Sequence, residues 1–319
     1  MPALHTFLPV IALTLIGTAV QCTSLPKTVP GDLFESLPAG GKKIRYISRD
    51  YSPEEFSTVK SREAARLKDN LKILFNENFD IITSKYINVS HRCLGKNMNT
   101  LLDHANIFFR EVYPKYFRER LKSSINVVYF RDREEFLEHT GTEYYGFYGP
   151  GINTFFTYCS TGYGTLWHEL MHAFLHNNTA AKPQYWFDEG LASFYVLADI
   201  QGAGIAEGFA NWKMELLHDA MRNGTMVHLR EMVRDRRFPE DPGFSQARLF
   251  FCYLWIHKKL TPFVQTYVYE LLPRYKGEEL AEAVITVLED LMGKGIEEIN
   301  REYLELAGGL KNREKLYQK

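Results

Sequence analysis

The sequence predicts an α+β protein, with a mixed β-sheet in an N-terminal lobe and a mostly helical C-terminal lobe. Three observations support this prediction. Short runs of β-branched and aromatic residues alternate with helical stretches between residues 53 and 158. From residue 205 onward the apolar pattern is mostly helical, and prolines and glycines divide it into segments. Between the two parts lies the pattern His-Glu-x-x-His at residues 168–172, within a stretch whose apolar spacing predicts a helix.

The N-terminus has the character of an export signal. Residues 1–24 contain no Lys, Arg, Asp or Glu, and residues 8–20 are almost wholly apolar. A stretch of that length is short for a membrane helix and fits the apolar core of a signal peptide. We therefore expect an exported protein that is periplasmic, on the cell surface or extracellular. A lipid tether at Cys22 and ordinary cleavage nearby both remain open, and an uncleaved apolar anchor is the third alternative.

The rest of the chain divides into a leader and two lobes. Residues 25–50 are rich in proline and glycine and predict an irregular leader. Residues 51–200 are expected to form the α/β lobe that carries the histidine motif, and residues 201–319 the helical lobe. No other stretch is long and apolar enough to span a membrane, so we expect no integral membrane domain.

The elements of the α/β lobe follow from local signals. Ser52 and Pro53 fit the cap and the first turn of a helix that runs to about Phe75. The run at 125–130 is the clearest strand, since it is rich in β-branched and aromatic residues. The other expected elements are strands at 79–84, 86–89 and 153–158, and helices at 101–117, where Pro114 marks the end, and 133–139.

In the C-terminal lobe, helices are expected at about 205–222, 243–259, 262–272, 277–291 and 296–307. Such a lobe closes over a cleft, or it forms a packing layer without a catalytic role.

Charge and cysteine usage narrow the function classes. The chain has 38 Lys and Arg against 39 Asp and Glu, and the basic residues are spread rather than clustered. This balance does not predict a nucleic-acid surface. Beyond Cys22 there are Cys93, Cys159 and Cys252, an odd count that is not a disulfide framework. Buried free thiols are the expectation, and a Cys93–Cys159 bridge in an oxidising compartment is the alternative.

The histidine motif predicts a metal site. Residues four apart share one face of a helix, so His168 and His172 can direct their imidazoles at one zinc ion. Glu169 is placed to take a proton from an attacking water without being a ligand itself. The apolar stripe of this helix lies on a different face, formed by Leu166, Leu170, Ala173 and Phe174.

A catalytic zinc site needs a third protein ligand and an open position. His176 is too far from His168, because eight residues of helix rise about 12 Å. The pattern with a third histidine after a glycine also fails, since Leu175 and Asn178 occupy those places. Glu189 remains, in the first turn of a second helix that follows a turn at residues 182–183, and the small Gly190 allows the two helices to pack closely. Asp188 is expected to be a helix-start acid, with a role in orienting a histidine as the alternative.

The motif at 168–172 together with Trp-Phe-Asp-Glu-Gly-Leu-Ala at 186–192 resembles the gluzincin metallopeptidases, and within them the exported peptidase MA-like group. The resemblance extends from about Phe79 to Tyr303 and is carried mainly by the two motifs. It implies a zincin-like fold with a cleft between the lobes, one catalytic Zn²⁺ held by His168, His172 and Glu189, and a peptide or protein substrate. It also implies an edge strand before the motif helix, for which we expect residues 153–158, preceded by a flap or plain loop at 144–151.

The resemblance further implies a donor in the helical lobe that stabilises the oxyanion. Relatives tend to have a tyrosine near the start of the helix where this chain has Phe244, which cannot donate. We expect Tyr253 to serve instead, with Tyr195, His218, His228 and Arg248 as further candidates. The alternative function is a non-catalytic zinc-containing module that binds a peptide or an envelope partner. A fourth protein ligand would mark that module, and a helix without metal is the last alternative.

Overall fold

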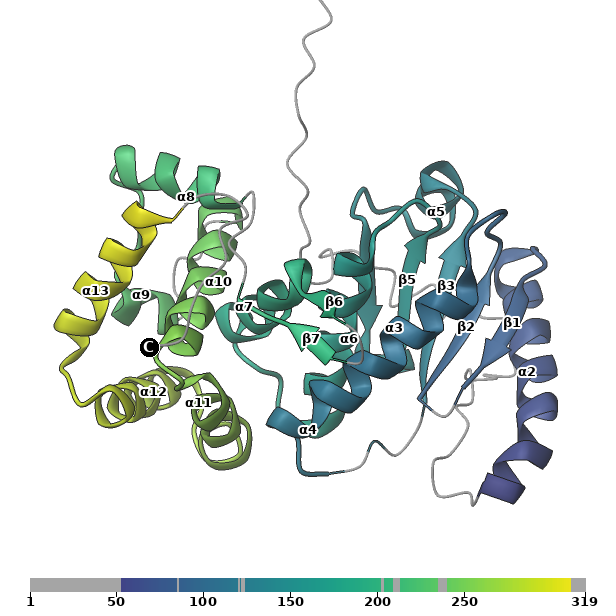
Figure 1. The fold of residues 1–319 in the computed structure, drawn as a ribbon, viewed down its shortest axis with the longest axis horizontal. Coiled ribbons are helices and arrows are strands. Elements are labelled where there is room, and N and C mark those ends of the chain that lie inside the picture. Colours follow the sequence, from purple (N-terminus) through teal and green to yellow (C-terminus); the bar gives the residue numbers. More distant parts are fainter. Residues whose placement is uncertain are drawn as a thin grey trace, which may run out of the picture.

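The computed structural model describes residues 53–84, 86–119, 121, 124–201, 204–208, 213–234 and 240–310. The predicted signal peptide at 1–24, with Cys22, and the leader at 25–50 lie outside these residues. The fold is α+β, as predicted: a mixed sheet with flanking helices lies on one side and a helical lobe on the other (Figure 1). No helix in the described part of the chain combines the length and the apolar character that a membrane crossing requires.

The described residues form a five-stranded sheet in the order β1-β2-β3-β5-β4. The three central strands are parallel, and the two edge strands run antiparallel to their neighbours. All six residues of the central strand β3 are buried, as expected for a strand covered on both faces. The strands are β1 (Asp80–Thr83), β2 (Ile87–His91), β3 (Ile125–Phe130), β4 (Gly146–Gly149) and β5 (Thr154–Tyr158).

Helices cover both faces of this sheet. Alternate residues of β3 point to opposite sides, so Val127 packs in the main core and Val128 in a smaller core on the other face. The smaller core is closed by α2 (Pro53–Phe75) and α5 (Arg133–Thr140). The main core is closed by α3 (Met98–Glu111), the short α4 (Tyr113–Tyr116) and the motif helix α6 (Tyr163–Asn178). The single helix expected at 101–117 is therefore two, with Pro114 in the first turn of α4.

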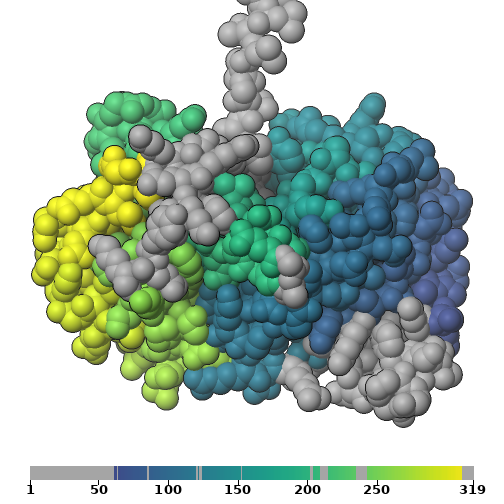
Figure 2. Space-filling view, viewed as in Figure 1, coloured from purple at the N-terminus to yellow at the C-terminus, as the bar shows by residue number. Residues whose placement is uncertain are grey.

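The helical lobe begins beyond a small hairpin, β6 (Asp199–Gln201) and β7 (Gly204–Ala206), where the sequence predicted the start of a helix. In Figure 2 the N-terminal lobe (blue to teal) and the C-terminal lobe (light green to yellow) occupy opposite sides of the molecule. The sequence did not predict the short α9. The helical elements are α8 (Lys213–Arg222), α9 (Leu229–Val233), α10 (Glu240–Ile256), α11 (Leu260–Thr266), η3 (Tyr267–Leu271), α12 (Gly277–Met292) and α13 (Ile296–Gly309).

The second motif helix, α7 (Tyr185–Phe194), lies between α6 and α10 (Figure 1). Gly190 was expected to serve the contact with the first helix, but it faces α10 instead. A Cβ on Gly190 would lie 2.6 Å from a ring carbon of Phe251 and 3.1 Å from the Cβ of Ala247. The backbone of α7 can approach α10 this closely only because residue 190 has no side chain.

Two of the cysteines are bonded, which corrects the expectation of free thiols. Cys93 and Cys159 form a disulfide with their Cα atoms 5.4 Å apart, while Cys252 is a buried free thiol. The bridge ties the segment after β2 to the segment between β5 and α6. Lys96 reinforces the same connection, since its Nζ donates to the carbonyl oxygens of Cys159 at 2.9 Å and Thr161 at 3.0 Å.

Candidate metal centre

The motif helix α6 is buried on almost every side. Every residue from Leu166 to Leu175 is buried, because α6 packs between the sheet, α3 and α7. The sequence had predicted one apolar stripe and one open face. His168 and Glu169 are 0% and 1% exposed, and His172 is 5% exposed. Imidazole and carboxylate groups buried this deeply need partners, because an unsatisfied polar group in the interior is costly.

The predicted ligand atoms converge. The Nε2 atoms of His168 and His172 lie 3.0 Å apart. Glu189 approaches both rings from α7: its Oε2 is 3.6 Å from His168 Nε2 and its Oε1 is 3.7 Å from His172 Nε2. The structure thus brings the three predicted ligands together, with the glutamate on the neighbouring helix as the spacing had indicated.

These separations suit one cation of zinc's size. Ligand atoms about 2.0–2.1 Å from a tetrahedral ion lie about 3.3–3.4 Å from one another. The observed separations of 3.0, 3.6 and 3.7 Å bracket that value. Two imidazole nitrogens and one carboxylate are also a donor set that zinc accepts in catalytic sites. Within the described residues, this group contains three His, Cys, Asp or Glu side chains and no fourth.

Asp188 orients one of the histidines. Its Oδ1 lies 2.6 Å from His172 Nδ1, and its Oδ2 lies 2.8 Å from His176 Nε2. With the Nδ1 proton of His172 directed at Asp188, a neutral imidazole keeps its lone pair on Nε2, which faces His168 and Glu189. Both roles expected for Asp188 are therefore observed, since it is an acid in the first turn of α7 and its carboxylate is bonded to a histidine. His176, rejected as a ligand by its distance from His168, is the second partner of this carboxylate.

The charges of this group shift two pKa values. Burial lowers the pKa of His172, but Asp188 and Glu189 outweigh this effect and raise it to about 10. Burial also disfavours the charged form of Asp188, yet His172 and His176 hold the pKa of its carboxyl well below the usual range. Asp188 is thus a fixed negative charge behind His172, and a cation in the site would compete with a proton on that ring.

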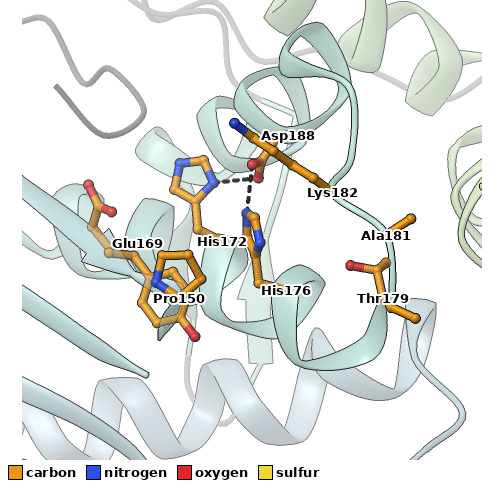
Figure 3. Close-up of a pocket in the computed structure, with 10 residues that line it drawn as sticks. Pro150, Glu169, His172, His176, Thr179, Ala181, Lys182 and Asp188 are labelled. Atoms are coloured by element: carbon orange, nitrogen blue, oxygen red, sulfur yellow. Dashed lines mark hydrogen bonds and ion pairs between the residues drawn. The ribbon is translucent and has the colours of Figure 1, made fainter. Parts of the chain in front are cut away.

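Glu169 lines a cavity together with His172 and His176, whereas His168 and Glu189 are not among its lining residues. The cavity has a volume of about 330 Å³. Figure 3 shows Glu169 and Pro150 at one end of it, His172 and His176 in the middle, and the connection between α6 and α7 at the other end. Glu169 belongs to the same helix as both histidine ligands, but it is not part of the three-residue ligand group. The arrangement therefore gives a carboxylate beside the candidate cation and a space in which a reactant can lie.

The strand at the edge of the sheet is not the one that we expected. The stretch at 153–158 contains β5 (Thr154–Tyr158), which lies between β3 and β4 and has no free edge. The edge strand beside β5 is β4, from the stretch at 144–151 that was expected to be a flap or a plain loop. Tyr148 of β4 and Pro150, which follows it, both line the cavity. The Tyr148 hydroxyl is 2.7 Å from the Oδ1 of Asn153.

The predicted oxyanion donors have partners elsewhere. The hydroxyl of Tyr253 donates to Glu302 Oε2 at 2.8 Å, across the packing of α10 against α13. The four further candidates also contact other groups, and none of the five is among the described residues that line the cavity. Those contacts are Tyr195 with Tyr116 and Glu207, His218 with the Ala307 carbonyl, His228 with Glu297, and Arg248 with the Ser193 carbonyl.

The cavity contains polar groups for which the sequence predicted no role, although His176 was weighed as a zinc ligand and rejected. They are Tyr148, His176 and Lys182. For His176 a signal existed, because it lies four residues after His172 and shares its face of the helix.

Comparison with models of known protein families and with curated proteins gives no match to this chain.

Proposed function

We propose that this protein is a zinc-dependent peptidase of the gluzincin type, with a zincin-like fold. The observation that carries the proposal is the convergence of His168 Nε2, His172 Nε2 and the Glu189 carboxylate at 3.0–3.7 Å, beside a cavity lined by Glu169. Two imidazoles and one carboxylate leave room for a further ligand in a tetrahedral site. That is the requirement for a catalytic rather than a purely structural ion.

Each residue has a distinct role in this proposal. His168, His172 and Glu189 would hold the ion, and Asp188 would orient His172. Zinc, when bound, supplies a Lewis acid that polarises the scissile carbonyl and lowers the pKa of the attacking water. Glu169 accepts a proton from that water and delivers it to the leaving amine. Burial of the whole group excludes bulk water, which strengthens the interactions of these charges.

The substrate would bind along β4. Among the described strands β4 pairs with β5 alone, and although its four residues are buried, its other side is the edge to which an extended peptide would pair. Its residue Tyr148 lines the cavity that contains Glu169. This replaces our expectation that the strand at 153–158 receives the peptide.

Export is part of the same proposal. A disulfide such as Cys93–Cys159 forms in oxidising compartments, which agrees with the signal peptide expected at 1–24. The proposed site of action is therefore the periplasm, the cell surface or the medium.

The test uses the purified protein without its signal sequence and a peptide library, digested with and without a chelator. We expect about one zinc per chain and cleavage that the chelator abolishes. Glu169→Gln should keep the zinc and lose cleavage by a factor of at least about 100. Glu189→Ala should lose zinc affinity by more than about a hundredfold. Zinc binding by the wild type without cleavage of any peptide would support the non-catalytic module, and cleavage by Glu169→Gln at the wild-type rate would refute the mechanism.

A further inference from the structure

The cavity beside Glu169 has a wall made by the connection between α6 and α7. Thr179, Ala180 and Ala181 form this wall, and all three side chains are small and uncharged. Tyr148 and Pro150 also line the cavity, and Figure 3 shows Pro150 at the end away from this wall. A volume of about 330 Å³ is enough for one or two amino-acid side chains of a bound peptide.

The charged groups of this lining are mostly paired with one another. Both oxygens of Asp188 are occupied, Oδ1 by His172 at 2.6 Å and Oδ2 by His176 at 2.8 Å. The proposed mechanism uses Glu169 as the proton acceptor. The remaining charge is the ammonium group of Lys182, which is exposed and forms no ion pair with any residue in the described part of the chain.

Lys182 is directed across the cavity rather than away from it. In Figure 3 its side chain runs from the α6–α7 connection toward the side where His172 and Asp188 lie, while Thr179 and Ala181 stay at the other end. An ammonium group in this place attracts an anionic group of a bound peptide. Residues 179–181 carry no positive charge, so an anion at this wall meets no cation there other than Lys182.

We propose that this cavity is a subsite for a carboxylate of the peptide substrate, recognised by Lys182. The carboxylate belongs to an acidic side chain next to the cleaved bond or to the C-terminus of the peptide. The inference rests on the proposed peptidase function and specifies its substrate class. An exposed ion pair of this kind is worth about a two- to fivefold preference for the charged substrate, and salt weakens it.

The experiment uses peptides that differ only by Glu or Gln at one position near the cleaved bond, each with a free or an amidated C-terminus. The enzymes are the wild type, Lys182→Met and Lys182→Glu, with Lys276→Met as a control at an exposed lysine outside the cavity. We expect the wild type to prefer one carboxylate-bearing peptide about two- to fivefold in kcat/KM, mainly through KM, and less at high salt. Lys182→Met should lose this preference and Lys182→Glu should reverse it, whereas the control Lys276→Met should keep it.

The arms of the experiment separate the possible outcomes. A preference that depends on Glu identifies a side-chain carboxylate, and one that depends on the free terminus identifies the C-terminus. If the wild type cleaves charged and neutral peptides equally, or if Lys182→Met keeps the preference, the subsite proposal is wrong while the peptidase function stands. If the wild type shows no chelator-sensitive cleavage of any peptide, the proposed function itself fails, and the subsite with it.

Discussion

Asp188 and His172 are joined by a hydrogen bond of 2.6 Å between a carboxylate oxygen and Nδ1, and the second oxygen of Asp188 is 2.8 Å from His176. The bond sets which nitrogen of His172 can bind a cation. We expect Asp188→Asn to fold normally and to bind zinc about 10–100-fold more weakly, because the ring loses the charge that orients it. Competition with a chromophoric chelator measures this loss, and an unchanged affinity would show that Asp188 does not orient the ligand.

His176 provides the matched comparison for that experiment. His176→Gln removes the other partner of Asp188 but leaves the Asp188–His172 bond in place. Its zinc affinity should stay within about threefold of the wild type. A loss as large as that of Asp188→Asn would mean that the two histidines and the aspartate act as one unit.

Zinc binding should release a proton at neutral pH. The raised pKa of His172, about 10, means that the ring is protonated at pH 7 in metal-free protein, whereas a zinc ligand must be neutral. The apparent affinity should therefore rise with pH, by up to about tenfold per unit between pH 7 and 9, and level off above the pKa. Calorimetry in buffers of different ionisation enthalpy should show about one proton released per zinc at pH 7.5. A binding enthalpy that is independent of the buffer would contradict this prediction.

The contact of α7 with α10 should make residue 190 sensitive to any side chain. Gly190→Ala would place a Cβ 2.6 Å from the Phe251 ring, and we expect it to destabilise the protein by about 1–3 kcal/mol. Gly309→Ala is the control, since a Cβ there meets nothing within 4 Å and alanine favours a helix. Thermal unfolding of both variants checks the prediction. Equal melting temperatures would show that α7 and α10 can move apart at little cost.

The disulfide should stabilise the fold. Replacing both Cys93 and Cys159 by alanine should lower the free energy of unfolding by about 2–4 kcal/mol, because the open chain has more conformations to lose. Denaturant unfolding measures this difference. Adding a reductant should destabilise the wild type by a similar amount and leave the double variant unchanged. If the reductant destabilised both proteins equally, the stabilisation would not come from the Cys93–Cys159 disulfide.

The parts of the fold that were predictable are those with local causes. The run at 125–130 forms β3 over the same residues because its β-branched and aromatic side chains suit a strand that is buried on both faces. The convergence of His168 and His172 follows from the helical period alone. Glu189 follows from the spacing to the next helix, since a short connection brings the start of α7 back to α6.

The parts that were missed depend on contacts between distant segments. The strand β4 begins and ends with glycine, so its composition does not predict a strand, and it forms by pairing with β5. A Cβ on Gly146 would lie 2.6 Å from the Phe155 ring, a fact that only the paired strands reveal. The partner of Tyr253 is Glu302, on a helix far along the chain, and no spacing rule indicates that pair. The contact of Asp188 with His172 depends on how α7 is rotated against α6, which residue types alone do not determine.

The position of α7 between the lobes has a consequence for how the molecule holds together. The two histidines belong to a helix that packs on the sheet, whereas Glu189 belongs to a helix that packs on α10 of the other lobe. A single ion bound by all three side chains would thus link the N-terminal lobe to the C-terminal lobe. Binding and release of that ion would therefore change how firmly the two lobes are held together.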